Sequence, residues 1–334
     1  GVAYEESTTS QGIRSDITAW VEDSLYKSTY LTTNAQLYVL GNSASSSPTA
    51  PLGATQPLLV RNLQRWDLPY ADAKAKIDDL MLPQYSAETQ AVLDRMSALT
   101  QTEIDAIEAF VDGCVADGNW AKIDEFFCFA LNNTDWTKGF QAVTAIPNGS
   151  AAKTTNGVQF DAGSGNYIDT TLVLTTLTNY QLNDAEAGVY LQAQPDWGTG
   201  NNDLFGVQTG DTDPRLRMRH RGNDTNDFAA SINGTATVNS PLAATSLGNT
   251  LHTLKATASA AEIYLNGVLQ PNAVGAQPTI PPTFPVWIGV CNDTGAALQP
   301  NRAGTHTSFY IGGAIDTLAF YNRLTTFHTA LGVA

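Results

Sequence analysis

The chain lacks the hallmarks of several protein classes. Its 17 Lys and Arg residues against 32 Asp and Glu residues give a net charge of −15, whereas binding to nucleic acid needs a basic surface. No apolar run reaches the roughly 18 residues that cross a membrane. Three cysteines, Cys114, Cys128 and Cys291, are too few for a disulfide framework. These absences argue against a nucleic-acid partner, membrane insertion and a disulfide-stabilised fold.

Charged residues are also scarce in one part of the chain. Residues 132–334 hold 14 acidic and 9 basic residues, and Glu186 and Glu262 are their only glutamates. Thr, Asn, Gly, Ala and Ser take their place. A surface rich in amide and hydroxyl groups but poor in charge is typical of sugar-binding proteins and of virion proteins. It is also typical of secreted β-proteins in general.

The sequence offers little for catalysis. Glycoside hydrolysis needs two carboxylates about 5–9.5 Å apart, and the two glutamates of the C-terminal region stand alone. Residues 162–165 read Ala-Gly-Ser-Gly, short of the Gly-x-Ser-x-Gly of a nucleophile elbow. The histidines at 220, 252, 306 and 328 lack the spacing of zinc ligands. We therefore predict that the protein is not an enzyme and holds no cofactor.

The first 60 residues mix polar stretches with a short strand candidate at 35–40. They contain too little apolar surface to fold alone, so we predict an extended N-terminal arm that packs on a neighbour or a partner chain. A flexible tail is the alternative.

Residues 61–131 show helical periodicity and predict a small helical connector. A first helix is expected at 72–82, and Ser86 can cap a second that runs to Met96. Thr100 and Glu103 form a capping box for a third helix, which Asp117-Gly118 ends. The third helix places 104, 107, 111, 114 and 115 on one face. Asn119 is expected to cap a fourth helix through residue 131, whose aromatic residues imply burial on two sides.

After residue 131 the pattern changes to strands and turns, which recur every 8–12 residues as in a sandwich or jelly roll. The clearest signal is Asn266-Gly267 between two apolar strands, because a type I′ hairpin turn needs positive φ at both central residues. Strands are expected at 157–162, 166–170, 187–194, 203–209, 215–220, 227–234, 252–259, 261–267, 268–270, 286–290 and 309–322.

Two of these segments carry a resemblance to a known family. The sequences GNTLHTLKATASAAEIYLNGVLQ (248–270) and FYIGGAIDTLAFYNRLT (309–325) together resemble the laminin-G/concanavalin A-like jelly-roll superfamily. There the first segment forms a strand and a hairpin, and the second forms a closing strand, here through Gly313-Ala314-Ile315-Asp316. The resemblance implies a mainly β protein: a two-sheet antiparallel jelly roll over 132–334, preceded by the arm and the small α-helical connector.

A capped helix pair here leads directly into the segment 157–170. This order of segments resembles that of tailed-phage virion structural proteins that end in the same jelly roll. That likeness implies a non-enzymatic fibre, tail-tip or capsid-surface component of a virion. Its arm and helices would bind other virion proteins in a homo-oligomer, and its jelly roll would contact host surface glycan. A secreted or cell-surface carbohydrate-binding or adhesin module is the alternative, and a glycan-active enzyme is a third.

The segment RLRMRHR (215–221) alternates cations with other residues. In a strand this places four arginines on one face, while Leu216, Met218 and His220 fall on the other. The arginines would grip an anionic ligand, since guanidinium groups match carboxylate geometry. Alternatively they form a solvated face that pairs with Asp203, Asp211, Asp213, Asp224 and Asp227. The four residues are Arg215, Arg217, Arg219 and Arg221.

Four further loops contain residues that could contact ligands. Trp197 could offer its ring to a sugar, with polar contacts from neighbours, or it could anchor its loop in the core. Those neighbours are Asp196, Asn201, Asn202 and Asp203. The loops at 211–214, 222–227 and 291–295 are rich in Asp and Asn, which could ligate Ca²⁺, but these are also ordinary turn residues. No metal site is predicted from them, and Trp136 and Trp287 are expected in the core.

Overall fold

The computed structural model describes residues 85–333, except 133, 161–164, 193–201, 211–213, 222–227, 236, 241–248, 259, 271–280 and 299–303, together with four short strands nearer the N-terminus. The chain divides into two compact units, residues 1–84 and 85–334. None of the helices in the described part has the length and hydropathy of a membrane span.

The described part of the first unit consists of paired strands. Strand β1 (Val2–Glu6) runs antiparallel to β2 (Ser10–Arg14), and β3 (Ala35–Leu37) runs antiparallel to β4 (Trp66–Leu68). The strand expected at 35–40 is thus present over its first three residues. The helix expected at 72–82 lies outside the described residues.

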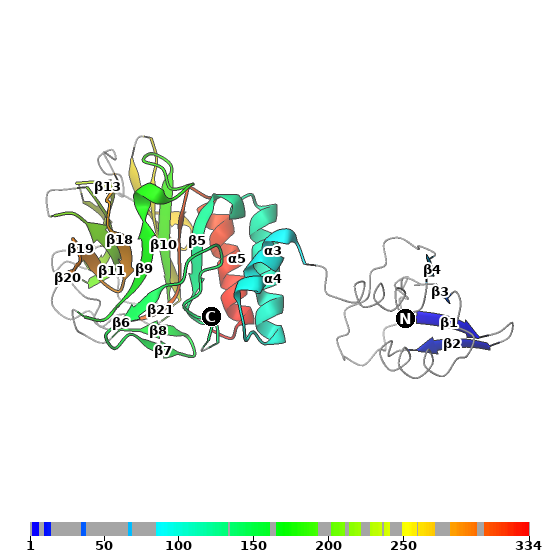
Figure 1. Cartoon of the computed structure of the whole chain (residues 1–334). Coiled ribbons are helices and arrows are strands. Elements are labelled where there is room, and N and C mark those ends of the chain that lie inside the picture. The colour runs from blue at the N-terminus through cyan, green and yellow to red at the C-terminus, as the bar shows by residue number, and fades with distance from the viewer. Residues whose placement is uncertain are drawn as a thin grey trace. The chain divides into compact units, whose positions relative to one another are not determined.

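The second unit is a sandwich of two sheets with helices against one of them (Figure 1). We call the sheet beside the helices sheet I; its order is β17-β16-β15-β10-β21-β8-β7, with β5 also paired to β21. Its strands are β5 (Ile123–Cys128), β7 (Ala152–Thr154), β8 (Gly157–Gln159), β10 (Ala185–Leu191), β15 (Thr250–Ala256), β16 (Ala261–Leu265), β17 (Val268–Leu269) and β21 (Thr305–Gly312).

The other sheet, sheet II, has the order β14-β13-β12-β11-β18-β9-β6, and β19 adds to β11 and β20. Its strands are β6 (Ile146–Asn148), β9 (Tyr167–Val173), β11 (Asn202–Gln208), β12 (Arg215–Arg221), β13 (Phe228–Gly234), β14 (Val238–Ser240), β18 (Pro285–Ile288), β19 (Cys291–Asp293) and β20 (Ala296–Leu298). The described pairings are antiparallel except that of β11 with β19. The mainly β, two-sheet, jelly-roll-like fold is therefore confirmed.

The helices are α3 (Ala87–Arg95), α4 (Gln101–Ala116) and α5 (Thr317–Ala330), with short 3₁₀ turns η3 (Trp120–Lys122) and η4 (Leu174–Thr176). Ser86 caps α3, and Thr100 and Glu103 make the predicted capping box of α4. Asp117 is the C-cap of α4, followed by Gly118 with φ 71°. One expected core position is wrong: Val115 is 40% exposed.

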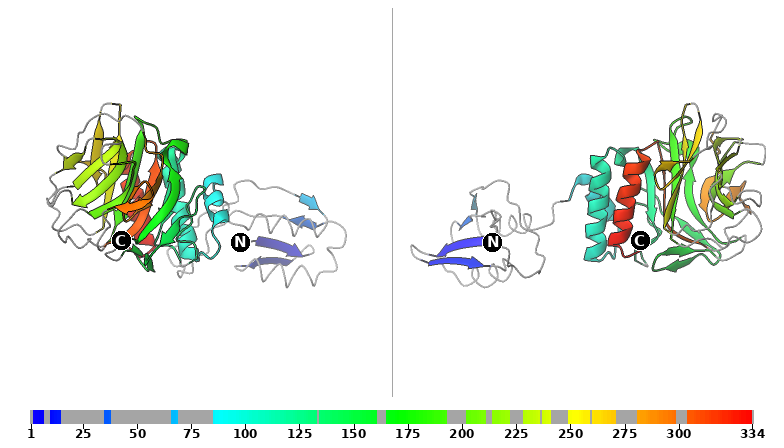
Figure 2. Two further views of the ribbon diagram at one scale, coloured as in Figure 1. Left: turned by 60° about the vertical axis from the view of Figure 1, so that its left-hand side comes forward. Right: turned by 180° about the vertical axis from the view of Figure 1, so that it is seen from behind.

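The core has two layers. Between the sheets, inward residues from both sides interdigitate, as in the contact of Phe205 on β11 with Phe309 on β21, whose ring centroids lie 5.3 Å apart. On the outer face of sheet I, Phe110 of α4 stacks on Phe327 of α5 at 4.8 Å and lies 4.9 Å from Phe126 of β5. Figures 1 and 2 show the three helices on this side only. Sheet I is thus buried on both faces.

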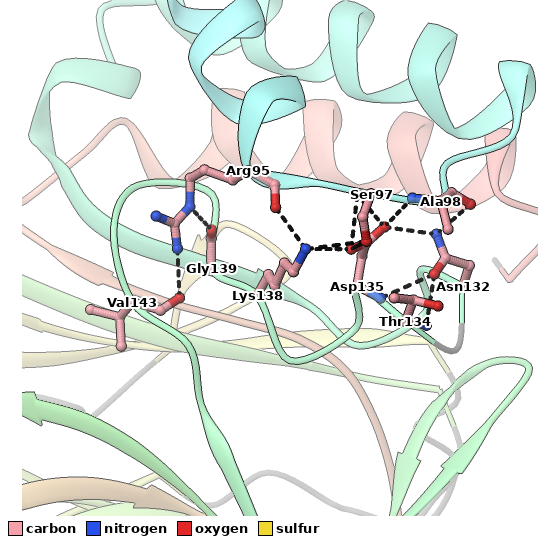
Figure 3. Close-up of polar contacts among 9 residues, drawn as sticks. All are labelled: Arg95, Ser97, Ala98, Asn132, Thr134, Asp135, Lys138, Gly139 and Val143. Carbon is pink, nitrogen blue, oxygen red and sulfur yellow. Dashed lines mark hydrogen bonds and ion pairs between the residues drawn. The ribbon is translucent and has the colours of Figure 1, made fainter.

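A polar seam fixes α3 to the segment that leads into the sandwich (Figure 3). The buried carboxylate of Asp135 accepts hydrogen bonds from the Ser97 and Ala98 backbone at 3.0–3.1 Å and pairs with Lys138 Nζ at 2.9 Å. Burial alone would raise the pKa of Asp135, but Lys138 and these donors outweigh it and hold the pKa well below its ordinary value. Because every oxygen is paired, this network holds the structure together and leaves no free group for a ligand.

The Asn266-Gly267 hairpin is confirmed. Both residues have positive φ, 51° and 76°, and Leu265 pairs with Val268 across the turn. A Cβ at position 267 would lie 2.7 Å from the Cα of Leu318 in α5, so this turn also needs glycine for lack of space.

Two predicted elements are wrong. The helix expected over 120–131 ends at Lys122 and is followed by β5. Burial on two sides is nevertheless present, because Phe127 faces the inter-sheet core while Phe126 faces the helices. Aromatic residues suit such a doubly buried strand.

The expected closing strand through 313–316 is the second error. Strand β21 ends at Gly312, and Asp316 begins α5 by accepting a hydrogen bond from the Ala319 N–H at 3.0 Å. The residues that follow bury Phe320, Leu324 and Phe327 at helical spacing.

Candidate functional site

The outer face of sheet II carries the arginines of β12. The strand alternates as predicted: Leu216 and Met218 point into the inter-sheet core. Arg215, Arg217 and Arg219 lie on the opposite face and are 9%, 3% and 7% exposed. The alternative of a solvated arginine face is therefore wrong for these three. Arg221 ends the strand, and its side chain lies outside the described residues.

Arg217 forms a buried ion pair with Asp203 of β11. Its Nε and Nη2 each donate to one carboxylate oxygen at 2.8 Å, and Nη1 donates to Gln208 Oε1 at 3.2 Å. Asp203 is completely buried. The two-pronged geometry is the strongest form of this contact. The predicted pairing of the arginine strand with Asp203 is thus confirmed, but it lies inside the protein.

Arg215 is held by the neighbouring strand. Its Nε donates to Ser231 Oγ at 3.2 Å, while Nη2 donates to the Thr235 carbonyl at 2.9 Å and to Thr237 Oγ1 at 3.0 Å. These contacts align its guanidinium along the sheet and supply no negative charge.

Arg219 differs from both. Its buried Nε has no hydrogen-bond partner in the described part of the chain. Burial lowers the pKa of this guanidinium, Arg217 and Arg215 lower it further, and Asp203 opposes them. A buried N–H donor without an acceptor is costly. This donor is therefore a candidate for contact with an anion from outside the chain.

An aromatic pair lies on the same face. Trp287 on β18 is flanked by the inward residues Val286 and Ile288, so its own side chain points outward. Tyr167 of β9 stacks on it with ring centroids 3.9 Å apart and an interplanar angle of 15°. Trp287 is 6% exposed, and its indole Nε1 has no hydrogen-bond partner among the described residues. It is buried as expected, but outside the inter-sheet core; Trp136 packs against that core.

The structure does not assemble the predicted Trp197 site. Trp197, Asp196 and Asn201 lie outside the described residues, as does the side chain of Asn202 at the start of β11. Asp203 is buried with both oxygens on Arg217. Sequence reasoning missed Tyr167 and Trp287, although strand alternation at 286–288 could have placed Trp287 outward.

No cluster of three or more metal-ligating side chains occurs in the described ranges, which leave out 211–213 and 222–227. In the third acidic loop, Asn292 donates to the Pro285 carbonyl at 2.7 Å and accepts from the Gly295 N–H at 2.8 Å. This side chain thus shapes the β19–β20 hairpin.

Buried carboxylates elsewhere have protein partners. Glu186 on β10 accepts hydrogen bonds from Tyr310 at 2.6 Å, from Thr317 at 3.2 Å and from the Ile315 N–H at 3.1 Å, and lies 3.6 Å from Lys255 Nζ. Burial raises its pKa to about 7 despite these contacts. It joins the start of α5 to sheet I.

Glu125 accepts from four backbone N–H groups, those of Phe126, Gln141, Ala142 and Val143. It therefore shapes the segment after β5. Neither glutamate presents a free oxygen at a surface.

Comparisons with known proteins find no matching family model and no matching curated protein. Among solved structures, a Trypanosoma rangeli sialidase complexed with 2,3-difluorosialic acid matches with TM-score 0.46 and 12% identity over 67% of this chain and 40% of that one.

Domain 4 of AbnA, a GH43 extracellular arabinanase from Geobacillus stearothermophilus, in complex with arabinotriose, matches with TM-score 0.38 and 12% identity over 60% of this chain and 97% of that one. The receptor binding domain of a botulinum neurotoxin C/D mosaic serotype matches with TM-score 0.43 and 12% identity over 60% of this chain and 51% of that one. The chain thus spans well under half of the sialidase. Values this low identify neither a family nor an activity for this protein.

Proposed function

We propose that this protein is a non-catalytic binding protein whose sandwich holds an anionic glycan on the outer face of sheet II. The observation that carries the proposal is Arg219, a buried guanidinium whose Nε has no hydrogen-bond partner within the described residues. Asp203 is the buried acid beside these arginines, and it is already paired with Arg217. An anion at Arg219 would supply the missing acceptor and charge.

A glycan suits this face better than a bare anion. The Tyr167–Trp287 stack offers an aromatic surface on the same side of the sheet, and sugar sites combine such surfaces with a few polar groups. Among the described carboxylates, Glu125, Glu186 and Asp203 are completely buried, which leaves these three unavailable for catalysis at the surface. We therefore expect no release of reducing ends when the protein is incubated with acidic or neutral oligosaccharides.

Binding of the full chain to immobilised polysialic acid, polygalacturonate, dextran sulfate and neutral dextran tests the proposal. We expect retention on at least one acidic polymer, weaker at high salt, and none on dextran. Arg219→Gln should lower the affinity at least tenfold, because a hydrogen bond to a charged group contributes about 1.5–3 kcal/mol.

Arg323→Gln is the matched control. It removes one arginine from the α4–α5 surface, where Arg323 pairs with Asp117, and should bind like the parent. Retention on no acidic polymer, or equal losses in the two variants, would refute the proposal.

We also infer that the protein is a structural component of a virion, as the sequence resemblance implies. The division of the chain into two compact units, residues 1–84 and 85–334, is consistent with one anchoring part and one displayed part. The anchoring arm and the helices would bind other virion proteins in a homo-oligomer. Mass spectrometry of purified particles should find this chain in stoichiometric amounts. Its absence from particles, with presence at a cell surface, would favour the alternative of a secreted or cell-surface adhesin module.

A further inference from the structure

Two obligate donors are buried without an acceptor on one face of one sheet. They are Arg219 Nε and Trp287 Nε1, and neither has a hydrogen-bond partner within the described residues. Both side chains are more than nine-tenths buried. Buried N–H groups are normally satisfied, so these two unsatisfied donors on the same face are candidates for acceptors that come from outside the chain.

Strand register places the two donors. Ile288 pairs with Phe205, so Trp287 lies near Gly206, which pairs with Arg217 of β12 on one side and with Cys291 of β19 on the other. Arg219 lies two residues further along β12 and therefore points to the same side. With strands about 4.8 Å apart and about 3.3 Å per residue, the Cα atoms of Trp287 and Arg219 are about 12 Å apart.

The strand between the two donors carries no side chain at the matching position, and the side chains of Cys291 and Arg217 fill that space. Position 206 is glycine, and a Cβ there would lie 3.1 Å from Cys291 Sγ and 3.2 Å from Arg217 Cγ. No side chain of β11 therefore stands between the Trp287 indole and the stem of Arg217. Cys291 is buried, and burial raises its pKa, so it adds no negative charge of its own.

We propose, building on the function inferred above, that the glycan is a carboxylate-bearing saccharide that spans this face. Its carboxylate pairs with Arg219, and a hydroxyl or ring oxygen accepts from Trp287 Nε1 beside the Tyr167 ring. The arrangement selects against neutral sugars, which leave Arg219 Nε without an anionic acceptor. This selection follows because an unpaired buried polar group costs more than an additional contact gains.

The test measures affinities of the full chain for α2,8-linked trisialic acid, trigalacturonic acid and their carboxyl-reduced counterparts by calorimetry. At least one acidic trimer should bind, and its reduced form should bind at least tenfold more weakly. Trp287→Phe, which keeps the stack on Tyr167 but removes the N–H, should weaken the acidic trimer about fivefold. Competition by inorganic sulfate should be the same in parent and variant.

Trp136→Phe is the matched control, because Trp136 packs on the inter-sheet core near Phe129. This variant should bind the acidic trimer with the affinity of the parent. A second readout does not depend on the variant folding well. In ¹H–¹⁵N spectra of the parent, the Trp287 indole signal should move on addition of the trimer, and the Trp136 indole signal should not.

Equal affinity for the acidic and reduced trimers, or an unmoved Trp287 indole signal in a saturated complex, would overturn this inference while leaving anionic-glycan binding intact. Failure to bind any acidic polymer would instead refute the proposed function itself.

Discussion

The two sheets of the sandwich differ in what covers their outer faces. The outer face of sheet I lies under α3, α4 and α5, with the rings of Phe110, Phe126 and Phe320 packed between them. The outer face of sheet II carries arginines, one buried carboxylate and an aromatic pair. Apolar burial of the first kind stabilises a fold directly. Buried charge of the second kind gives little net stability, and the proposed binding role would account for its presence.

The helix-covered face should be the most sensitive to truncation. Phe110→Ala removes a ring that packs on β5, on α5 and on Phe140, and should lower the free energy of unfolding by about 3–5 kcal/mol. Leu318→Ala on α5 is the control, since Leu318 is 51% exposed, and its cost should stay below about 1 kcal/mol. Urea denaturation measures both. Similar small losses would mean that the helices contribute little to the stability of the sandwich.

On the other face, the cost should depend on which charge is left behind. Arg217→Leu leaves the buried carboxylate of Asp203 without its partner and should lower the free energy of unfolding by about 3–5 kcal/mol. Adding Asp203→Leu to that variant removes both charges and should recover most of the loss, again read by urea denaturation. A double variant as unstable as Arg217→Leu would show that the pair matters for its shape more than for its charge balance.

The pH dependence of stability should separate Glu186 from the buried histidines. Burial raises the pKa of Glu186 from 4.5 to about 7. The folded protein therefore holds a proton that the unfolded chain releases between these values. Stability from this group is complete below about pH 4.5 and is lost as the pH rises through 7, with a total of about 3 kcal/mol.

His252, His306 and His328 act in the opposite sense. Burial lowers their pKa values from 6.5 to about 3, 4 and 3. The unfolded chain therefore binds more protons below about pH 6.5, and stability falls as the pH falls. The three histidines together outweigh Glu186, so we expect the free energy of unfolding to rise from pH 4 to 6.5 and to level off near pH 7. Glu186→Gln should make the rise between pH 5 and 7 steeper in denaturation series; an unchanged slope would contradict the assigned pKa.

Whether the sequence predicts a feature of the fold depends on how far apart in the chain the interacting residues lie. The capping box at Thr100 and the Asn266-Gly267 turn involve residues a few positions apart, so local rules identified them. Strand β5 was mistaken for a helix because its pairing with β21 joins residues far apart in the chain. The tail after Gly312 was mistaken for a strand because the resemblance outweighed the helical spacing of Phe320, Leu324 and Phe327.

The candidate site shows the same limit. Alternation placed Arg215, Arg217 and Arg219 on one face, and that was confirmed. Their burial, and the hydrogen bonding of Arg217 Nε but not of Arg219 Nε within the described residues, depend on a register with β11 that no local pattern contains. Trp287 joined the site for the same reason, because β18 comes beside β11 only in the folded sheet.

The most direct test of the contrast between the two faces is Arg219→Leu, measured for both stability and binding. If Arg219 is kept for a ligand, the variant should unfold at the same or a higher urea concentration than the parent and should lose at least tenfold in affinity for the acidic polymer that the parent retains. A variant that is destabilised by several kcal/mol and binds that polymer as the parent does would show that Arg219 belongs to the architecture of sheet II, and would contradict the account.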